Sequence, residues 1–501
     1  MFSLNKIKIY FLYLTLLISG AVILVMEIAG ARLLAPFYGS TVFVWSALIV
    51  VALGFLALGY FVGGFFADKY PKGQYFYFII FLGGAIALLL IKLNQPLLVF
   101  SNKFGFKFGP LIAALLLFSL PFFFLSMASP FAIRLRSREL EQTGRISGIV
   151  FGSSTIGSLF GALLAGFYLI PNFFVLDILT VSAISAMITA IIGLFLERSL
   201  WRMRISSILL FFLLFFLPFI GSGAGTKASV IYRQPSFYGE IQVVERNGFR
   251  CLSVNNQSQT CIGSNGEQAL KYGNMIKIIA KNNFQTGDRA LVIGLGGGIV
   301  ARDLSDNFKT VETIEIDSQM VSVAKEFFGY DDSGPKLSTH IADGRNYIQT
   351  SNEKYDMIIL DAFSGANPAP HLYTKEAFEE MKNILTSEGM LIVNTIGRPY
   401  GQNIALTHSV FKTLNSVFPH LTAISTENIA KEPTAFGNIL LAASFNNKEI
   451  FIKEDFIIDY NEDDLEEGVL LTDAYNPIEM LGLPICEESQ KNYHRLFLGS
   501  L

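Results

Sequence analysis

Seven long apolar runs in the first half of the chain constrain its fold more than any other feature. A hydrocarbon core about 30 Å thick is crossed by roughly 20 residues of α-helix. The runs cover approximately residues 9–29, 42–66, 75–93, 111–133, 146–170, 173–196 and 205–220, and the last is the shortest. Because they lack paired charges, they predict a multi-pass helical domain in a lipid bilayer over residues 1–226.

Charge divides the chain at the same place. Residues 1–226 hold 15 Lys and Arg against 6 Asp and Glu, whereas residues 227–501 hold 23 against 35. Neither part has the dense basic patch that nucleic-acid binding requires. We therefore expect a membrane-embedded part, an acidic water-exposed part and no nucleic-acid partner.

The loops between the apolar runs carry an orientation signal. With the N-terminus in the cytosol, the cytosolic loops hold 11 Lys and Arg and the opposite loops hold 4. The positive-inside rule favours this orientation. Seven crossings then place the second half outside the cytosol, whereas six crossings return it to the cytosol, so the loops alone leave its side open.

The second half shows the strand and helix alternation of an α/β domain. ALVIGLGGGIV, VETIEID, YDMIILDAF and GMLIVNTIG are apolar runs of strand length within residues 286–445. Helical stretches separate them, which predicts a parallel sheet with helices on both faces. Residues 227–285 read as a small β-stranded unit with a turn at Asn255 and Asn256, and residues 446–501 as an acidic C-terminal tail.

Glycines and acids follow the predicted strands, at the sheet edge where such folds bind ligands. Gly294 and Gly296 lie in the turn after the first strand, where a missing Cβ lets the backbone approach a ligand. Glu315 ends the next strand and can accept both hydrogen bonds of a ribose. Asp343 follows the third strand-like segment, and Asp361 closes YDMIILD. This register predicts a nucleoside site.

These motifs resemble those of the polyamine aminopropyltransferases, or spermidine synthases, in the bacterial form fused to a multi-pass membrane segment. The resemblance covers residues 232–397, and the opening ISGAVILVMEIAGARLLAPFYGS is similar to the membrane part of such fusions. It implies a Rossmann-like, methyltransferase-type domain preceded by a small β unit. It further implies aminopropyl transfer from decarboxylated S-adenosylmethionine to an amine such as putrescine, with release of methylthioadenosine and without a metal.

The nucleoside side of the family site carries over residue by residue. The resemblance implies cofactor-binding roles for Gly294, Gly296, Glu315, Asp343, Gly344 and Pro368. It makes Asp361 the catalytic proton acceptor. On the substrate side it implies that Tyr272 or Tyr373 orients the amine, and it places Ser364 where the family has the second Asp of a D-x-x-D loop.

The amine side differs from the family pattern. Gly239 stands in place of a Gln in the first hairpin, and Gly297 in place of an Asp in the glycine turn. Gly273 and Asn274 replace a His-Glu pair after Tyr272. A diamine in a pocket needs carboxylates to balance its charge, so the acceptor stays open.

Two other functions also stay open. One is an S-adenosylmethionine-dependent methyltransferase-type enzyme, and the other is a membrane carrier regulated by a nucleoside-binding domain. Homo-oligomerisation is open as well. Because the sulfonium co-substrate is made in the cytosol, we expect a multi-pass protein of the cell membrane with its catalytic part on the cytosolic side.

The cysteines give little support for a metal site. The chain has 3 cysteines and no C-x-x-C motif, which zinc sites commonly use. Cys251 and Cys261 flank the expected hairpin and can bridge in an oxidising compartment. We expect two buried free thiols instead.

Overall fold

The computed structural model describes residues 2–39, 41–137, 142–218, 229–284, 286–364, 367–446, 450, 452–460 and 466–493. The chain divides into two compact units, Met1–Ala224 and Gly225–Leu501. The boundary expected at residue 226 falls outside the described residues. Each unit has its own core of buried apolar side chains.

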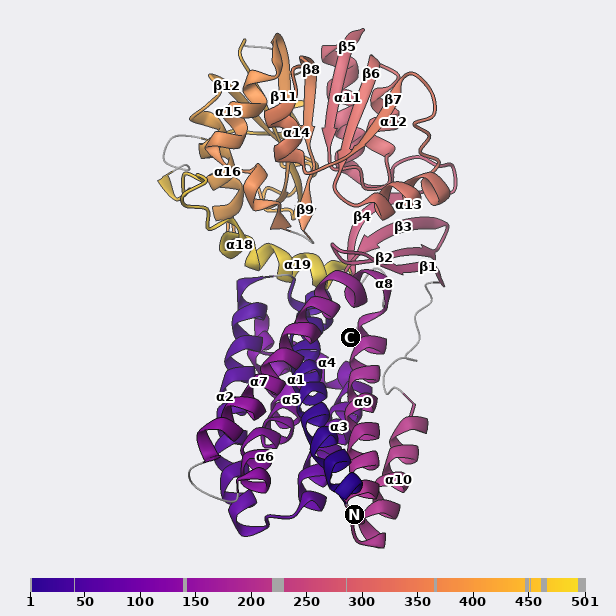
Figure 1. The fold of residues 1–501 in the computed structure, drawn as a ribbon. Coiled ribbons are helices and arrows are strands. Elements are labelled where there is room, and N and C mark those ends of the chain that lie inside the picture. The colour runs from indigo at the N-terminus through magenta and orange to yellow at the C-terminus, as the bar shows by residue number, and fades with distance from the viewer. Residues whose placement is uncertain are drawn as a thin grey trace. The chain divides into compact units, whose positions relative to one another are not determined.

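The first unit is helical (Figure 1). Its elements are α1 (Phe2–Tyr38), α2 (Val42–Lys69), α3 (Gly73–Lys92), α4 (Asn94–Asn102), α5 (Gly105–Ser126), α6 (Ala128–Arg136), α7 (Thr143–Leu164), the π-helix η2 (Ala165–Leu169), α8 (Ile170–Asn172), α9 (Val175–Leu196) and α10 (Trp201–Phe216). The described residues contain 6 helical stretches long and apolar enough to cross a membrane, Asn5–Tyr38, Val42–Lys69, Gly73–Lys92, Gly105–Arg136, Thr143–Asn172 and Val175–Leu196. They coincide with the first six predicted runs and indicate membrane insertion.

The seventh predicted crossing does not reach this length. It corresponds to α10, which has 16 residues, fewer than the roughly 20 that span the hydrocarbon core. The buried ammonium of Lys92 in α3 donates to the carbonyl of Phe215, 3.3 Å away, and to that of Leu217. Carbonyl groups at a helix end need such donors, so Lys92 caps α10 at this point. Because α10 is too short to cross the hydrocarbon core, the described helices supply six candidate spans rather than seven.

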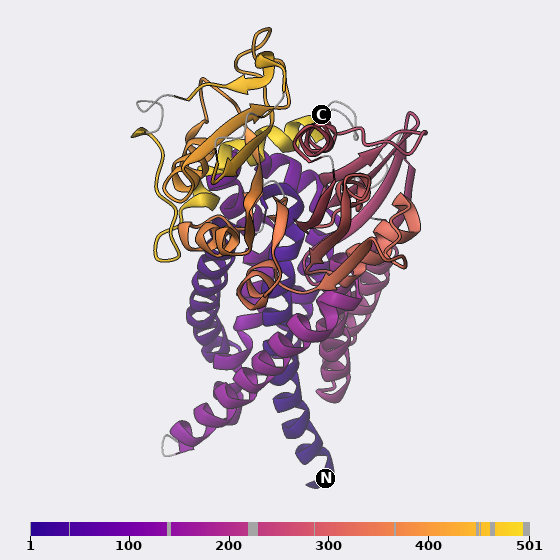
Figure 2. The ribbon, with the colours of Figure 1, turned by 90° about the horizontal axis from the view of Figure 1, so that it is seen from above.

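Helices α1 and α7 cross in close contact (Figure 2). A Cβ added at Gly157 would lie 1.9 Å from the Leu17 carbonyl oxygen, and one at Gly161 would lie 2.6 Å from that of Ala21. Larger side chains would force the backbones apart. Close approach at small residues is a common way for helices to associate in lipid.

The second unit combines an eight-stranded sheet, a four-stranded sheet and a two-stranded hairpin with surrounding helices (Figure 1). Its strands are β1 (Ser229–Pro235), β2 (Glu240–Arg246), β3 (Phe249–Val254), β4 (Gln257–Ile262), β5 (Gly287–Ile293), β6 (Phe308–Glu315), β7 (Leu337–Ile341), β8 (Tyr355–Leu360), β9 (Phe363–Ser364), β10 (Asn367–Pro368), β11 (Leu385–Gly397), β12 (His420–Ser425), β13 (Gly437–Ser444) and β14 (Ile457–Ile458). Its helices are α11 (Lys271–Asn283), α12 (Ile299–Leu304), α13 (Ser318–Phe328), α14 (Gly344–Thr350), η3 (Pro370–Leu372), α15 (Lys375–Asn383), α16 (Ala405–Asn415), η4 (Glu454–Phe456), α18 (Ile478–Leu481) and α19 (Leu483–Tyr493).

The large sheet has eight strands in the order β14-β12-β13-β11-β8-β5-β6-β7. Strands β11, β8, β5, β6 and β7 are parallel, as predicted. Strand β13, which lies outside the four predicted strands, runs antiparallel to both of its neighbours, β11 and β12, so the sheet is mixed at this edge. No helix separates β12 from β13 in the described chain, and strands joined without a crossover pair antiparallel. The result is a mixed, Rossmann-like sheet of the methyltransferase type.

Both faces of this sheet are buried, which explains the uninterrupted apolar runs of its strands. In β8, Ile358 and Leu360 join the core formed with α15 and α16. Met357 and Ile359 point to the opposite face, where the core includes residues of α11, α12 and α13. Successive residues of a strand face opposite sides, so a strand covered on both sides is apolar throughout.

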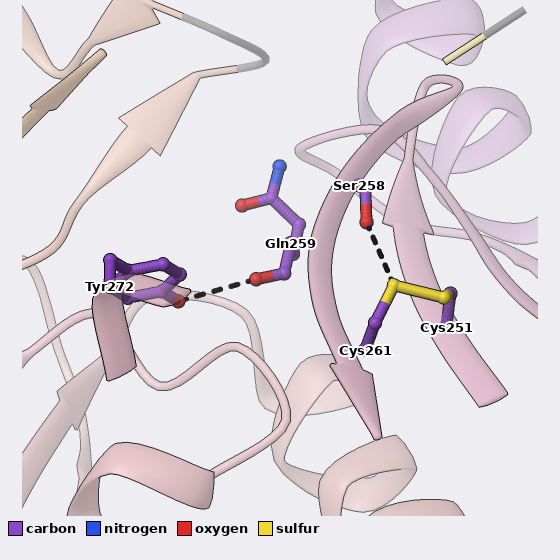
Figure 3. Close-up of a disulfide and its surroundings, with 5 residues drawn as sticks. All are labelled: Cys251, Ser258, Gln259, Cys261 and Tyr272. Atoms are coloured by element: carbon purple, nitrogen blue, oxygen red, sulfur yellow. Dashed lines mark hydrogen bonds between the residues drawn. A yellow bond between two sulfur atoms is a disulfide. The ribbon is translucent and has the colours of Figure 1, made fainter. Parts of the chain in front are cut away.

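The small sheet pairs β1, β2, β3 and β4 in sequence order. Asn255 and Asn256 connect β3 to β4 with φ angles of 50° and 61°, which confirms the predicted turn. Cys251 and Cys261 face each other across these two strands and form a disulfide (Figure 3). The expectation of two free thiols is therefore wrong, because the hairpin register places the two side chains directly opposite one another.

Candidate active site

The glycine turn after β5 and the end of β8 meet at the carboxyl edge of the large sheet. The N–H of Gly294 donates to the Ile314 carbonyl of β6 over 2.9 Å, and the N–H of Asp361 donates to the Ile293 carbonyl of β5 over 2.9 Å. Gly294 has a φ of +97°, a conformation that L-residues rarely adopt. The structure thus brings Gly294 and Asp361 together at one edge, as a shared nucleoside site requires.

Strand β4 of the small sheet completes the glycine turn. The N–H of Gly297 donates to the hydroxyl of Thr260 over 2.9 Å. Gly296 has a φ of +52°, and a Cβ on it would lie 2.9 Å from the same hydroxyl. Sequence reasoning missed Thr260, whose proximity to the turn depends on how the two sheets pack.

Glu315 holds the turn from the tip of β6. One carboxylate oxygen accepts from the Leu295 N–H and the other from the Asp317 N–H, each over 3.0 Å. Burial raises the pKa of Glu315, while these backbone donors work against the increase. Each carboxylate oxygen has further lone pairs, so Glu315 can hold the turn and still accept a ribose hydroxyl.

Asp343 caps α14 and faces a histidine. Its Oδ1 accepts from the Asn346 N–H over 3.0 Å, and its Oδ2 lies 2.9 Å from Nε2 of the exposed His371. A Cβ on Gly344 would lie 2.7 Å from Cγ2 of Ile293, so a glycine lets the start of α14 approach β5. The capping role does not consume both oxygens of Asp343.

Tyr238, in the connection between β1 and β2, has a pKa that depends on the acids at the carboxyl edge of the large sheet. Its pKa is raised first by burial and then by the negative charges of Asp317, Asp343 and Glu315. Three acids from the ends of β6 and β7 therefore share one region of space with an aromatic side chain from the small unit. No motif in the sequence singles out Tyr238 beyond its place in the first hairpin.

Asp361 is held by two neutral side chains. Its Oδ1 accepts from Nδ2 of Asn394 over 2.7 Å, and the hydroxyl of Tyr272 hydrogen-bonds to the same carboxylate. Burial raises the pKa of Asp361, and both hydrogen bonds oppose that increase. A carboxylate with a raised pKa that still receives hydrogen bonds is suited to accept a proton near neutral pH.

The two predicted amine-orienting tyrosines occupy different positions. The hydroxyl of the buried Tyr272 of α11 donates to the Gln259 carbonyl over 3.4 Å (Figure 3). The same hydroxyl also lowers the pKa of Asp361. The buried Tyr373 donates to the backbone carbonyl of Asn394 over 2.9 Å. The Tyr373 hydroxyl is thus committed to the backbone of β11, which leaves Tyr272 beside the proton acceptor.

The loop after Asp361 begins with a short hairpin. Phe363 pairs with Pro368, and Ser364 pairs with Asn367. Pro368 is buried. The structure describes the backbone of Ser364 but not its side chain, so its role as a substrate residue stays a prediction.

No metal site emerges from the part of the chain that the structure describes. Those residues contain no group of three or more His, Cys, Asp or Glu side chains positioned to hold an ion. The groups that the structure places around the glycine turn are carboxylates, a phenol and amides.

Comparison with known proteins assigns the second unit to a family. Residues 269–454 match the spermine/spermidine synthase domain. The polyamine aminopropyltransferase of Vibrio vulnificus is 33% identical over 198 residues, which cover 37% of this chain and 66% of that protein, just under two thirds of its length. The human eEF1A lysine and N-terminal methyltransferase is 35% identical over 145 residues, which cover 26% of this chain and 20% of that protein.

Solved structures of the same kind match the second unit. The crystal structure of spermidine synthase from Thermotoga maritima is 19% identical, with a TM-score of 0.38, and the match covers 48% of this chain and 87% of that one. On the match of residues 269–454 and the identity to polyamine aminopropyltransferases, the second unit contains a domain of the spermine/spermidine synthase family.

Proposed function

We propose that this protein is a membrane-anchored aminopropyltransferase that moves an aminopropyl group from decarboxylated S-adenosylmethionine to an amine. The observation that carries the proposal is the setting of Asp361. Its carboxylate receives hydrogen bonds from Asn394 and Tyr272 and adjoins a glycine turn that leads to Glu315 and Asp343. A proton acceptor thus lies beside a nucleoside cradle, which aminopropyl transfer requires.

The reaction follows from the charge of the sulfonium donor. The lone pair of a neutral amine attacks the aminopropyl carbon, a C–N bond forms, and the C–S bond breaks with its electrons moving to sulfur. The products are methylthioadenosine and a protonated secondary amine, which transfers one proton to Asp361. Because the leaving group is already activated, the protein contributes mainly position and a proton acceptor.

We propose that the nucleoside of the donor hydrogen-bonds to two acids, Glu315 and Asp343. Glu315 accepts from the ribose hydroxyls, and Asp343 accepts from the adenine amino group at the oxygen that faces His371. Gly294 and Gly296 let the turn approach the nucleoside. Buried Pro368, after Asp361, is proposed to line the same pocket.

The acceptor side is built from neutral groups at the positions where the family pattern is lost. A Cβ on Gly273 would lie 2.9 Å from Nε2 of Gln268, and one on Gly297 would lie 2.7 Å from Cγ2 of Thr260. These side chains occupy the space that larger residues would need. A diamine needs carboxylates to balance its second charge. We therefore propose to compare putrescine, the acceptor that the resemblance implies, with a monoamine of equal chain length, which carries no second charge.

The test is methylthioadenosine release by the full chain in detergent or vesicles. Asp361→Asn is expected to lower turnover by about a thousandfold, in line with general-base catalysis, while donor affinity stays within about threefold. Asp306→Asn, at an exposed acid of the same domain, is the matched control and is expected to keep full activity. Equal turnover in Asp361→Asn would remove Asp361 from the mechanism.

One observation favours a second function. The human eEF1A lysine and N-terminal methyltransferase is 35% identical over 145 residues, and intact S-adenosylmethionine differs from the proposed donor by a carboxylate. The product decides between the two functions. Methylthioadenosine from the decarboxylated donor supports aminopropyl transfer, whereas S-adenosylhomocysteine from the intact donor supports methyl transfer.

We further propose that the catalytic unit is cytosolic. Six candidate spans are an even number, which returns the chain to the side of its N-terminus, and the loop charges favour a cytosolic N-terminus. The Cys251–Cys261 bridge is the opposing observation, because disulfides persist mainly in oxidising compartments. A C-terminal reporter active only in the cytosol tests this placement. Activity of a reporter that requires export would overturn it.

A further inference from the structure

A second asparagine stands behind the one that contacts Asp361. Asn394 in β11 is 1% exposed, and its Oδ1 accepts from Nδ2 of Asn438 in β13 over 3.0 Å. The other end of the same amide donates to Asp361 over 2.7 Å. The described contacts thus form a line from Asn438 through Asn394 to the carboxylate.

The direction of this line matters because an amide has two different ends. An ionised carboxylate only accepts hydrogen bonds, whereas an Asn amide has an NH₂ donor and a C=O acceptor of nearly the same shape. If the Asn394 amide turned over, its oxygen would face the Asp361 carboxylate and repel it. A donor at the oxygen end of Asn394 prevents this turn.

We propose, on the basis of the aminopropyl transfer inferred above, that Asn438 is a positioning residue for the reaction. Its NH₂ group fixes the Asn394 amide so that an N–H, and not a C=O, faces the Asp361 carboxylate. Asn438 has no described contact with Asp361 and acts through Asn394. Asn438 thereby keeps the Asp361 carboxylate in position and hydrogen-bonded during turnover.

The backbone around Asn438 is held well enough for this role. Its carbonyl accepts from both the N–H and the hydroxyl of Thr426, each over 3.0 Å. It pairs with Ile396 of β11 in the antiparallel ladder. A side chain on a rigid strand holds its partner more accurately than one on a loop. The antiparallel direction of β13 is what brings Asn438 to Asn394.

The other side chains near the Asp361 carboxylate do not fix the orientation of the Asn394 amide. Tyr272 of α11 hydrogen-bonds to Asp361, and the buried Tyr373 before α15 is influenced by its charge. Both are phenols whose own pKa values are raised by burial, so they stay neutral over the working range. The Tyr373 hydroxyl binds the backbone of Asn394 and leaves the amide side chain free to turn.

Substitution of Asn438 tests the proposal. Asn438→Leu removes the donor at similar volume, and Asn438→Asp places an acceptor against the Asn394 oxygen. We expect turnover to fall about tenfold in Asn438→Leu and further in Asn438→Asp, as for a misaligned catalytic group, with the donor KM within about twofold. Asn446→Leu, just beyond the end of the same strand, is the matched control and is expected to keep wild-type turnover.

The pH profile separates positioning from a loss of folding. The Asn394 hydrogen bond lowers the pKa of Asp361, so its loss moves the acidic limb of the kcat profile to higher pH in both variants. In an Asp361→Asn background, Asn438→Leu is expected to have no further effect on residual turnover, since coupled residues are not additive. An unshifted profile, or a full tenfold loss in that background, would overturn the proposal.

An infrared titration keeps this test independent of the proposed activity. The carboxyl band of Asp361 is identified by its loss in Asp361→Asn, and its titration is expected to move to higher pH in Asn438→Leu. If the wild-type chain releases no methylthioadenosine, the proposed function fails, and this titration still decides whether Asn438 controls Asp361. An identical titration in wild type and variant refutes the positioning role.

Discussion

Gly294 and Asp361 follow different strands, β5 and β8, yet a Cβ on Gly294 would stand 2.2 Å from the carbonyl oxygen of Asp361. The glycine turn and the catalytic strand end therefore share one small space. A side chain at position 294 would push the glycine turn and Asp361 apart. We therefore expect the proposed binding and chemical steps to be coupled through this backbone contact.

Gly294→Ala is expected to disrupt both steps. The positive φ and the 2.2 Å contact with backbone leave an added methyl group no room, and strain of this kind costs about 3 kcal/mol. Hydrogen–deuterium exchange of β5 and nucleoside affinity measure the loss. Gly334→Ala, at an exposed glycine with no other heavy atom within 4 Å of where the added methyl group would lie, is expected to change neither.

Asp361→Asn is expected to stabilise the domain at neutral pH while it removes activity. Burial raises the folded pKa of Asp361 above its unfolded value, so the stability linked to this shift is present below the unfolded pKa and lost as pH rises through the folded pKa. At pH 7 the ionised Asp361 carboxylate therefore destabilises the folded domain. Its removal should strengthen the domain by roughly 1 kcal/mol.

The stability change in Asp361→Asn has to be measured with a probe that reports on the second unit only. Both tryptophans, Trp45 and Trp201, lie in the first unit, so tryptophan fluorescence does not report on β8. Amide exchange of β8 peptides does. Slower exchange in Asp361→Asn at pH 7, with no difference below the ordinary carboxylate range, is the expected result, and faster exchange at pH 7 would contradict it.

Asp343 combines two roles that substitution can separate. Serine is also a good N-cap, so Asp343→Ser is expected to preserve α14 while it weakens nucleoside binding about tenfold, the usual scale for a hydrogen bond to a charged group. Asp343→Ala should lose both. Calorimetry of methylthioadenosine binding and amide exchange of α14 give the two readouts. Wild-type affinity in Asp343→Ser would exclude this acid from adenine recognition.

The Cys251–Cys261 bridge predicts a labelling pattern. The purified, denatured chain should take up one alkyl group, at Cys486, without reductant and three after reduction, because only Cys486 is a free thiol. A bridge that closes 10 residues contributes about 3 kcal/mol, so reduction should speed amide exchange in β3 and β4. Three labels without reductant would show that the thiols are free.

The sequence alone determined the features that depend on local pattern. The long apolar runs predicted the membrane helices, and the spacing of Gly294, Glu315 and Asp361 predicted the sheet edge where the site lies. Hydrophobic length and the order of strand, turn and acid are properties of neighbouring residues. Predictions from these properties do not depend on the order and direction of the strands in the sheet.

Only the tertiary structure decided the contacts between distant residues. The antiparallel direction of β13 brings Asn438 to Asn394 across 44 positions of sequence, and the register of β3 and β4 brings Cys251 to Cys261. The packing of the small sheet brings Thr260 to the glycine turn. Such pairings depend on strand order, direction and register, which are set by the summed packing of the whole domain and not by the residues near each partner.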